Sequence, residues 1–135
     1  RYRMVRSTAL SGHTRISLSK IKLLIVDDHP LVRHGLRRIL ERENEIEVVG
    51  EAGDGQDAID VTGQTQPDVI LMDINLPGIS GIEATRRIVA SYPETTVVLL
   101  STYAAADLPP EATTCGAATY LNKEDLCPAT LRALR

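Results

Sequence analysis

Asp73 is a carboxylate at the end of an apolar segment, a position that is unfavourable for a charge. It directly follows four apolar residues, 69–72, and the pair Pro77-Gly78 marks a turn soon after it. A short apolar run of this kind is typical of a buried strand. Burying a carboxylate is costly unless a cation or a metal ion compensates its charge. We therefore expect Asp73 to have a cationic partner and a chemical task.

Four further polar residues are placed in the same way, after other apolar runs. They are Asp27 and Asp28 after residues 22–26, Ser101 at the end of residues 95–101, and Lys123 after residues 118–122. If these runs are parallel strands, their carboxyl ends meet at one edge of a sheet, where such sheets bind ligands. The spacing therefore predicts a single polar site built from the ends of four strands.

Three carboxylates at one edge favour a divalent cation. Without one, each would raise the pKa of its neighbours. Mg²⁺ takes oxygen ligands and uses one or two carboxylates together with water and phosphate. The set has no cysteine, and we interpret His29, which precedes Pro30, as a residue that caps or packs the helix start. Zinc is therefore not expected, and Mg²⁺ is.

The same residue types suit phosphoryl transfer. An aspartate can be the nucleophile and form an aspartyl-phosphate, and Asp73 is the lone acid at its strand end. Lys123 would neutralise charge on the phosphoryl group, and Ser101 would donate a hydrogen bond to its oxygens. Asp27 and Asp28, as an adjacent pair, suit metal binding better.

The composition is that of one globular domain. The 135 residues are 43% hydrophobic and 24% charged, which is ordinary for a protein with a single core. Residues 1–20 carry five basic and no acidic residues (+5), whereas residues 21–135 carry 10 basic and 18 acidic ones (−8). The acidic body argues against direct nucleic-acid binding.

Nothing in the sequence indicates secretion or a membrane. No apolar run approaches the roughly 20 residues of a membrane span, and the basic start lacks the apolar region of a signal peptide. Cys115 and Cys127 lack metal-ligand spacing, and we expect free thiols. We expect a cytoplasmic protein.

Strand and helix patterns alternate through residues 20–135. Apolar strands are predicted at 22–26, 46–52, 68–72, 95–101 and 118–122. Helices are predicted at 30–43, 56–66 and 80–92, with a poor helix near Pro109-Pro110 and a last helix from residue 128. This alternation predicts an α/β fold, a doubly wound parallel sheet with helices on both faces. Residues 1–19, rich in Arg and Ser, are predicted to be a flexible basic leader, either native or added.

Several segments resemble a known family. "LLIVDDHPLVRHGLRRIL", "EVVGEAGDGQDAI", "PDVILMDINLPGISGIEATRRI" and "GAATYLNKED" are similar to the receiver domain of two-component response regulators. The start "VDDHPLVR" resembles the NarL/LuxR (NarL/FixJ) subgroup. The resemblance covers residues 21 to about 132. It implies a flavodoxin-like (βα)₅ sandwich with strand order 2-1-3-4-5.

The resemblance also implies a role for each site residue. Asp73 would be the phosphoacceptor, Asp27 and Asp28 the acidic Mg²⁺ pocket, and the Asn75 backbone carbonyl a further metal ligand. Ser101 would be the switch hydroxyl, Tyr120 the switch aromatic, and Lys123 the active-site lysine. Another interpretation of Tyr120 stays open, that of an ordinary tyrosine at a strand end.

Three features depart from the family pattern. Thr102 follows Ser101 where a smaller residue is usual, so phosphoryl access could be slower. Glu124 follows Lys123 where many receivers have a proline in a cis peptide. The segment around Pro109-Pro110 replaces a regular fourth helix, on the face the family uses for signalling.

The resemblance implies a phosphorelay switch and not a turnover enzyme. A sensor histidine kinase would phosphorylate Asp73, and phosphorylation would favour a homodimer. Members of the subgroup continue into a helix-turn-helix domain that binds DNA. The sequence holds no such domain, and we expect an excised receiver whose DNA binding depends on the missing part. A natural stand-alone receiver is the alternative.

Three alternatives remain. A Mg²⁺-dependent phosphohydrolase of the haloacid dehalogenase type would use an aspartyl nucleophile, but it needs a second acid where this chain has Asn75. A nucleotide-binding domain would need a glycine-rich loop after the first strand, where this chain has "DDHPLVRHG". A degenerate receiver could act as an interaction module without phosphorylation.

Overall fold

Five parallel strands form the central sheet of the computed structural model, which describes residues 3–8, 14–102, 108–127 and 129–130. The strands are β3 (Ile21–Val26), β4 (Ile46–Ala52), β5 (Val69–Asp73), β6 (Thr96–Ser101) and β7 (Thr119–Asn122). Their order across the sheet is β4-β3-β5-β6-β7, and each neighbouring pair is parallel. Counted along these five strands, the order is 2-1-3-4-5. The predicted doubly wound fold is therefore confirmed.

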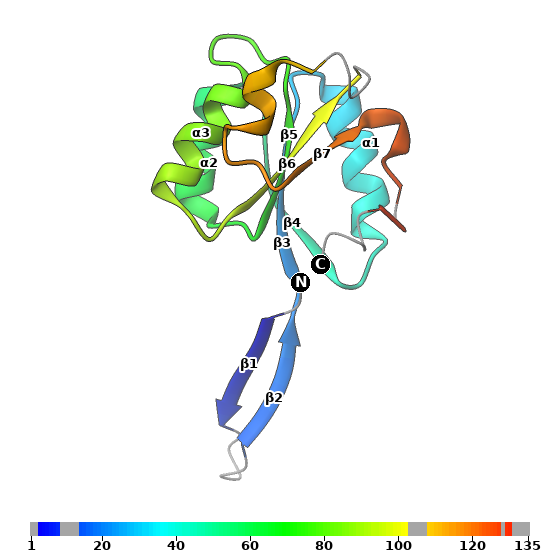
Figure 1. Ribbon diagram of the computed structural model, residues 1–135. Coiled ribbons are helices and arrows are strands. Elements are labelled where there is room, and N and C mark those ends of the chain that lie inside the picture. Colours follow the sequence, from blue (N-terminus) through cyan, green and yellow to red (C-terminus); the bar gives the residue numbers. More distant parts are fainter. Residues whose placement is uncertain (1–2, 9–13, 103–107, 128, 131–135) are drawn as a thin grey trace.

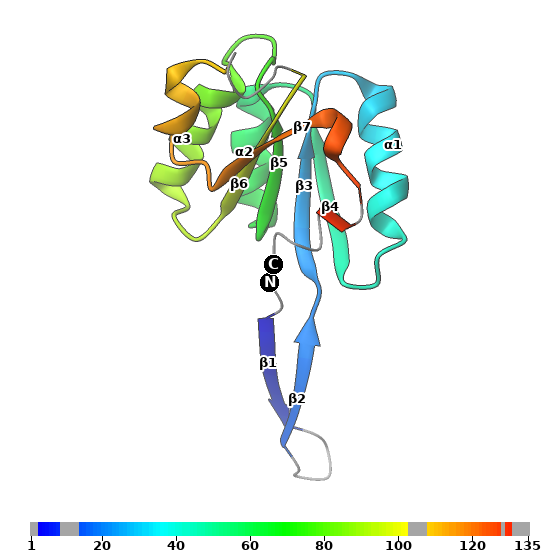
Figure 2. The same cartoon turned by 45° about the vertical axis from the view of Figure 1, so that its right-hand side comes forward.

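Helices cover both faces of this sheet. Helix α1 (Pro30–Glu41) lies on one face, and helices α2 (Gly55–Thr65) and α3 (Gly81–Ser91) lie together on the other (Figures 1 and 2). Pro30 occupies the first turn of α1, where its missing N–H costs nothing. Side chains cap the other two helices, because Asp54 accepts from the Asp57 backbone N–H and Ser80 from that of Glu83.

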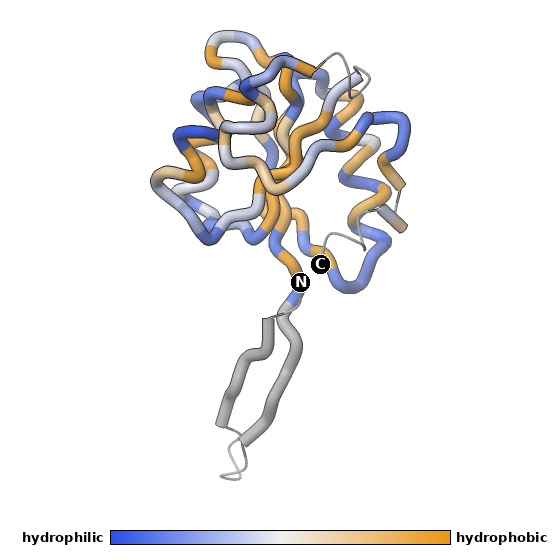
Figure 3. The backbone as a smooth tube through the Cα atoms, viewed as in Figure 1, coloured by the Kyte–Doolittle hydropathy of each residue, from blue (hydrophilic) through white to orange (hydrophobic). Residues whose placement is uncertain are grey.

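Alternate residues of the strands pack on opposite faces. In β3, Leu23 and Ile25 belong to the core under α1, whereas Leu24 and Val26 belong to the core under α2 and α3. All five residues of β5 are buried, which agrees with the apolar run of its first four residues, 69–72. Figure 3 shows the hydrophobic strands between more hydrophilic helices. The polar ends of these strands are thus held by a rigid apolar core.

The fourth helical segment is short. A 3₁₀ helix, η2 (Pro110–Thr113), stands where the sequence predicts a poor helix near Pro109-Pro110, and its Ala112 side chain is buried. The part of that segment at 103–107 lies outside the described residues, as does most of the predicted last helix, at residue 128 and 131–135. The described residues contain no cis peptide bond, so Lys123 and Glu124 are joined in trans.

The leader contains two strands that the sequence analysis did not predict. Strands β1 (Arg3–Thr8) and β2 (Thr14–Ser19) pair antiparallel and form a sheet of their own. The sequence "RISLS" alternates polar and apolar residues, which is the signal that could have found β2. The predicted flexibility of this leader stays a prediction.

Candidate functional site

The predicted site residues lie at the carboxyl edge of the sheet. Asp73 is the last residue of β5 and Ser101 the last of β6, while Asp27 directly follows β3 and Lys123 directly follows β7. Asp27, Asp73 and Ser101 are buried, with 0%, 3% and 2% of their surfaces exposed. Because all these strands are parallel, their ends place the two carboxylates and the lysine in one pocket.

Lys123 joins the two buried carboxylates. Its Nζ donates to Asp27 Oδ2 at 2.8 Å and to Asp73 Oδ2 at 3.1 Å. The lysine follows β7, so these two bonds connect the end of the edge strand with the ends of the central strands β3 and β5. Asp73 also accepts a hydrogen bond from the Asn75 backbone N–H at 3.1 Å. The expected cationic partner of Asp73 is therefore present.

The two carboxylates are not equally compensated. Burial raises the pKa of Asp73, and its bonds from the Asn75 N–H and Lys123 offset this only in part. Burial also acts to raise the pKa of Asp27, but hydrogen bonds from Lys123 and His29 outweigh it and hold that pKa below its usual value. For Lys123, both carboxylates outweigh burial and raise its pKa. The lysine therefore stays charged, and Asp27 holds the proton less readily than Asp73.

Asp28 and His29 extend this pocket. One ligand atom from each of Asp27, Asp28, His29 and Asp73 can be chosen so that all lie within 4.8 Å of one another. Asp28 Oδ1 is buried and makes no hydrogen bond among the described residues. His29 occupies the N-cap position of α1, yet its side chain makes no capping bond. The imidazole ring instead lies against the carboxylates of Asp27 and Asp28. The sequence analysis missed this contact, although the three residues are consecutive.

Arg33 supports the pocket through the main chain of Asp27. Its guanidinium Nη1 donates to the backbone carbonyl of Asp27, and its Nε donates to Glu51 Oε1 at 3.1 Å. Glu51 lies in β4 and also accepts from Arg37 at 2.7 Å. This half-buried network ties α1 and β4 to the main chain at Asp27. The sequence "LVRHGLRR" shows only exposed-looking arginines, so it gave no sign of this role.

Gly81 allows α3 to begin against the end of β5. A Cβ atom at this position would lie 1.9 Å from the backbone oxygen of Asp73. The Gly81 N–H also donates to the Ile74 carbonyl at 2.9 Å. The missing side chain thus sets how closely the helix approaches the Asp73 turn.

The remaining predicted residues lie around the pocket. Asn75 is exposed two residues after Asp73, and Thr102 is exposed directly after Ser101. Tyr120 lies in β7 with 37% of its surface exposed. Ser101 pairs in register with Asn122, the residue before Lys123. Their predicted roles stay predictions.

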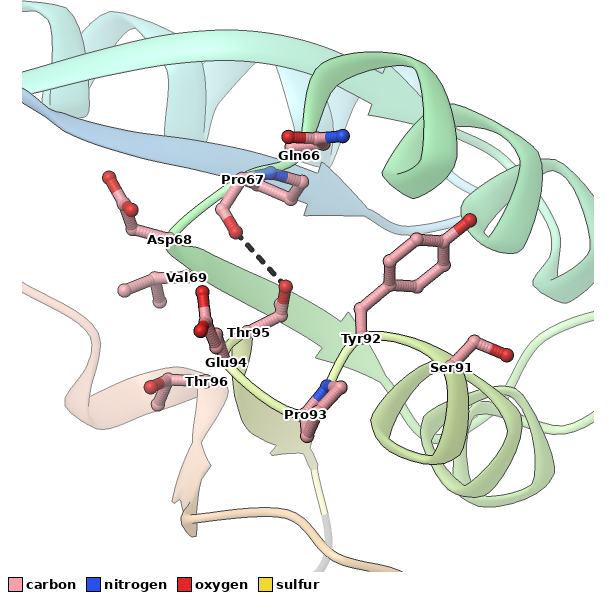
Figure 4. A pocket seen from close by; sticks show the side chains of 10 residues that line it. All are labelled: Gln66, Pro67, Asp68, Val69, Ser91, Tyr92, Pro93, Glu94, Thr95 and Thr96. Atoms are coloured by element: carbon pink, nitrogen blue, oxygen red, sulfur yellow. Dashed lines mark hydrogen bonds between the residues drawn. The ribbon is translucent and has the colours of Figure 1, made fainter.

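A separate cavity of about 800 Å³ lies at the opposite edge of the sheet. The segments 66–69 and 91–96 line it, and the Thr95 hydroxyl donates to the Pro67 carbonyl at 3.1 Å (Figure 4). Val69 and Thr96 are the first residues of β5 and β6, so the length of a strand separates this cavity from Asp73. Ligands of parallel α/β sheets bind at the carboxyl edge, which identifies the acidic pocket as the candidate site.

Comparisons with known proteins find a matching family and several relatives. The family described as "Response regulator receiver domain" matches residues 23–133. The transcriptional regulatory protein DegU of Brevibacillus brevis is 40% identical over 90% of this chain and 51% of its own length. The response regulator UvrY of Escherichia coli is 44% identical over 85% of this chain and 53% of its own length.

A solved structure shows the same fold. The signal receiver domain of NarL from Mycobacterium tuberculosis superposes with a TM-score of 0.78 at 34% identity, covering 86% of this chain and 94% of that one. The chain spans about half the length of the curated relatives that it matches. In the described part of the chain, no helix is long and apolar enough to span a membrane.

Proposed function

The chain belongs to the family of response regulator receiver domains, and from this premise we propose that it is a phosphorylation switch whose acceptor is Asp73. The observation that carries the proposal is the bridge from Lys123 Nζ to the buried carboxylates of Asp27 and Asp73, at 2.8 and 3.1 Å. A buried nucleophilic carboxylate beside a charged lysine is the arrangement that phosphoryl transfer to an aspartate needs.

The proposed step is an in-line displacement. A carboxylate oxygen of Asp73 attacks the phosphorus of a phosphohistidine on a sensor kinase. The P–O bond forms as the P–N bond breaks, and the electron pair of that bond stays on the leaving imidazole nitrogen, which takes up a proton from water. Lys123 Nζ stabilises the charge on the phosphoryl oxygens, and the Ser101 hydroxyl donates a hydrogen bond to one of them.

The residues of the pocket fit Mg²⁺. The buried Asp28 Oδ1 makes no hydrogen bond among the described residues, so an electropositive partner would stabilise it. Asp27, Asp28 and Asp73 would hold the ion together with the Asn75 backbone carbonyl, in the all-oxygen setting that Mg²⁺ prefers. When bound, Mg²⁺ supplies the positive charge that lets an anionic donor approach the three carboxylates.

The proposed output is a change of surface. Ser101 would engage the phosphoryl group, and Tyr120, now 37% exposed, would turn inward as the switch aromatic. We propose a homodimer on phosphorylation. We also propose DNA binding through a helix-turn-helix domain, because DegU is named a transcriptional regulatory protein and is about twice as long as the match. Residues 20–135 would be the receiver and residues 1–19 a basic leader.

A phosphohydrolase is not favoured as an alternative. Rapid turnover would need an acid–base group two residues after the nucleophile, and that position holds the amide Asn75. Receiver domains of response regulators are signalling switches, and we propose that this chain releases its own phosphoryl group slowly and is not a turnover enzyme.

The proposal is tested by intact-protein mass spectrometry after incubation with acetyl phosphate. We expect the mass of one phosphoryl group with Mg²⁺, no gain with EDTA, and no gain in Asp73→Asn. Asp60→Asn, which alters an exposed acid on α2, is the matched control and should gain the same mass as wild type. A folded wild-type protein that gains no mass with Mg²⁺ would contradict the proposal and favour a degenerate receiver.

A further inference from the structure

His29 is turned toward the acidic pocket and away from the helix it precedes. Its Nδ1 lies 3.2 Å from Asp27 Oδ1 and 2.9 Å from Asp28 Oδ1. The imidazole is 68% exposed, so the core does not hold it there. The backbone explains the placement, because the His29 N–H donates to Asp27 Oδ1 at 2.9 Å and fixes the turn after β3.

The distances around Nδ1 match those between neighbouring ligands of one ion. In an octahedral site with bonds of 2.0 to 2.1 Å, adjacent donor atoms lie about 3 Å apart. Nδ1 stands at such a distance from one oxygen of each acid. The Asp28 oxygen is close to Nδ1, yet the pair does not form a hydrogen bond, since that oxygen has no hydrogen-bond partner among the described residues. Without an ion, Nδ1 shares a hydrogen bond with Asp27 Oδ1. In the tautomer protonated at Nε2, the lone pair of Nδ1 would face the same space between the two acids.

An imidazole ligand changes which ions a carboxylate pocket prefers. Mg²⁺ gains little from nitrogen, whereas affinities of nitrogen-containing sites rise from Mn²⁺ through Co²⁺ to Ni²⁺. We propose that His29 is a ligand of the pocket for borderline transition ions, so that this receiver binds Co²⁺ more tightly than an all-oxygen pocket would. The proposal rests on the metal pocket of the proposed function and adds a ligand and an ion class to it.

The test is calorimetric titration of the protein with Co²⁺ and, separately, with Mg²⁺. We expect His29→Ala to weaken Co²⁺ binding by at least about tenfold, because losing a direct ligand should cost no less than losing a group that only orients one. Mg²⁺ binding should weaken by much less. His34→Ala removes an exposed histidine that lies within α1 and is the matched control, with both affinities at the wild-type level.

A spectroscopic measurement identifies the ligand directly. With Co²⁺ bound, the ¹H NMR spectrum should contain a strongly shifted, exchangeable imidazole N–H resonance that is absent in His29→Ala and retained in His34→Ala. Asp28→Asn should lose Co²⁺ affinity, since the ion lies against that acid. His29→Gln serves as a second variant if His29→Ala unfolds.

Three results would overturn the inference. They are equal losses of Co²⁺ and Mg²⁺ affinity in the His29 variants, persistence of the shifted resonance without His29, and Co²⁺ binding that is unaffected in Asp28→Asn. These outcomes are separate from the mass measurement with acetyl phosphate. A chain that binds Co²⁺ through His29 but gains no phosphoryl mass would refute the phosphorylation switch alone.

Discussion

The Asp73 carboxylate has a stability cost that follows from its pKa. Burial raises that pKa above the usual 3.8, so the folded state favours the protonated form more than the unfolded chain does. The resulting stabilisation is fully present below the unfolded pKa and is lost as the pH rises through the folded pKa. At neutral pH without metal, the ionised Asp73 therefore destabilises the fold.

We expect Asp73→Asn to be more stable than wild type at pH 7 in EDTA. The gain should be on the order of 1 kcal/mol, or about 4 °C in the midpoint of thermal unfolding. Circular dichroism at several pH values checks this, since the gain should shrink as the pH falls toward 4. The exposed Asp60→Asn variant should show no gain, and a less stable Asp73→Asn at pH 7 would contradict the argument.

A comparison of Arg33 with Arg37 tests whether Arg33 supports the metal pocket or only packs against it. Both arginines bind Glu51, but in the described structure only Arg33 also donates to the Asp27 main chain. We expect Arg33→Gln to weaken Mg²⁺ binding by about tenfold, because supporting contacts orient metal ligands. Arg37→Gln should leave the Mg²⁺ affinity unchanged. Isothermal titration calorimetry measures both, and equal effects would assign Arg33 a purely structural role.

At the scale of elements, the junction of β5 and α3 fixes the site. A methyl group at Gly81 would collide with the Asp73 backbone oxygen, whereas one at Gly35 in α1 would meet nothing within 4 Å. We expect Gly81→Ala to destabilise the fold by about 1 to 3 kcal/mol and to lower phosphorylation of Asp73. Gly35→Ala should stabilise it by roughly 0.5 to 1 kcal/mol through helix propensity. Denaturant unfolding checks both, and similar effects at the two sites would rule out the collision.

The elements that could be predicted from sequence are those with strong hydrophobic patterns. The predicted strand at 46–52 matches β4, and the predicted helix at 80–92 exceeds α3 by one residue at each end. The hairpin β1–β2 was missed because its alternation is short and interrupted by basic residues. The burial of Ala112, in η2, and of Cys115 also could not be predicted, because it depends on packing against distant parts of the chain.

The site could be predicted as far as strand ends determine it. Asp27, Asp73 and Lys123 were placed together because parallel strands share one edge. The contacts of His29 and Arg33 with Asp27 were not predicted, since both depend on side-chain directions at the start of α1. Gly81 was missed for a similar reason, because its importance lies in an approach between backbones.

At the scale of the whole molecule, the pocket joins segments that are distant in the sequence. Its groups follow or end β3, β5 and β7, and they converge only when the sheet is complete. The unfolded chain therefore offers Mg²⁺ no comparable site. An ion that binds only the native state stabilises it by mass action, by about 2.7 kcal/mol at one hundred times the dissociation constant.

We accordingly expect Mg²⁺ to raise the midpoint of thermal unfolding in a concentration-dependent way, relative to sodium chloride of equal ionic strength. Asp28→Asn removes a proposed ligand whose oxygen has no hydrogen-bond partner among the described residues, so it should abolish most of this rise without unfolding the apo protein. Asp60→Asn should keep the full rise. An equal rise in all three proteins would mean that Mg²⁺ acts through general screening of the −8 charge on residues 21–135 and not through the pocket.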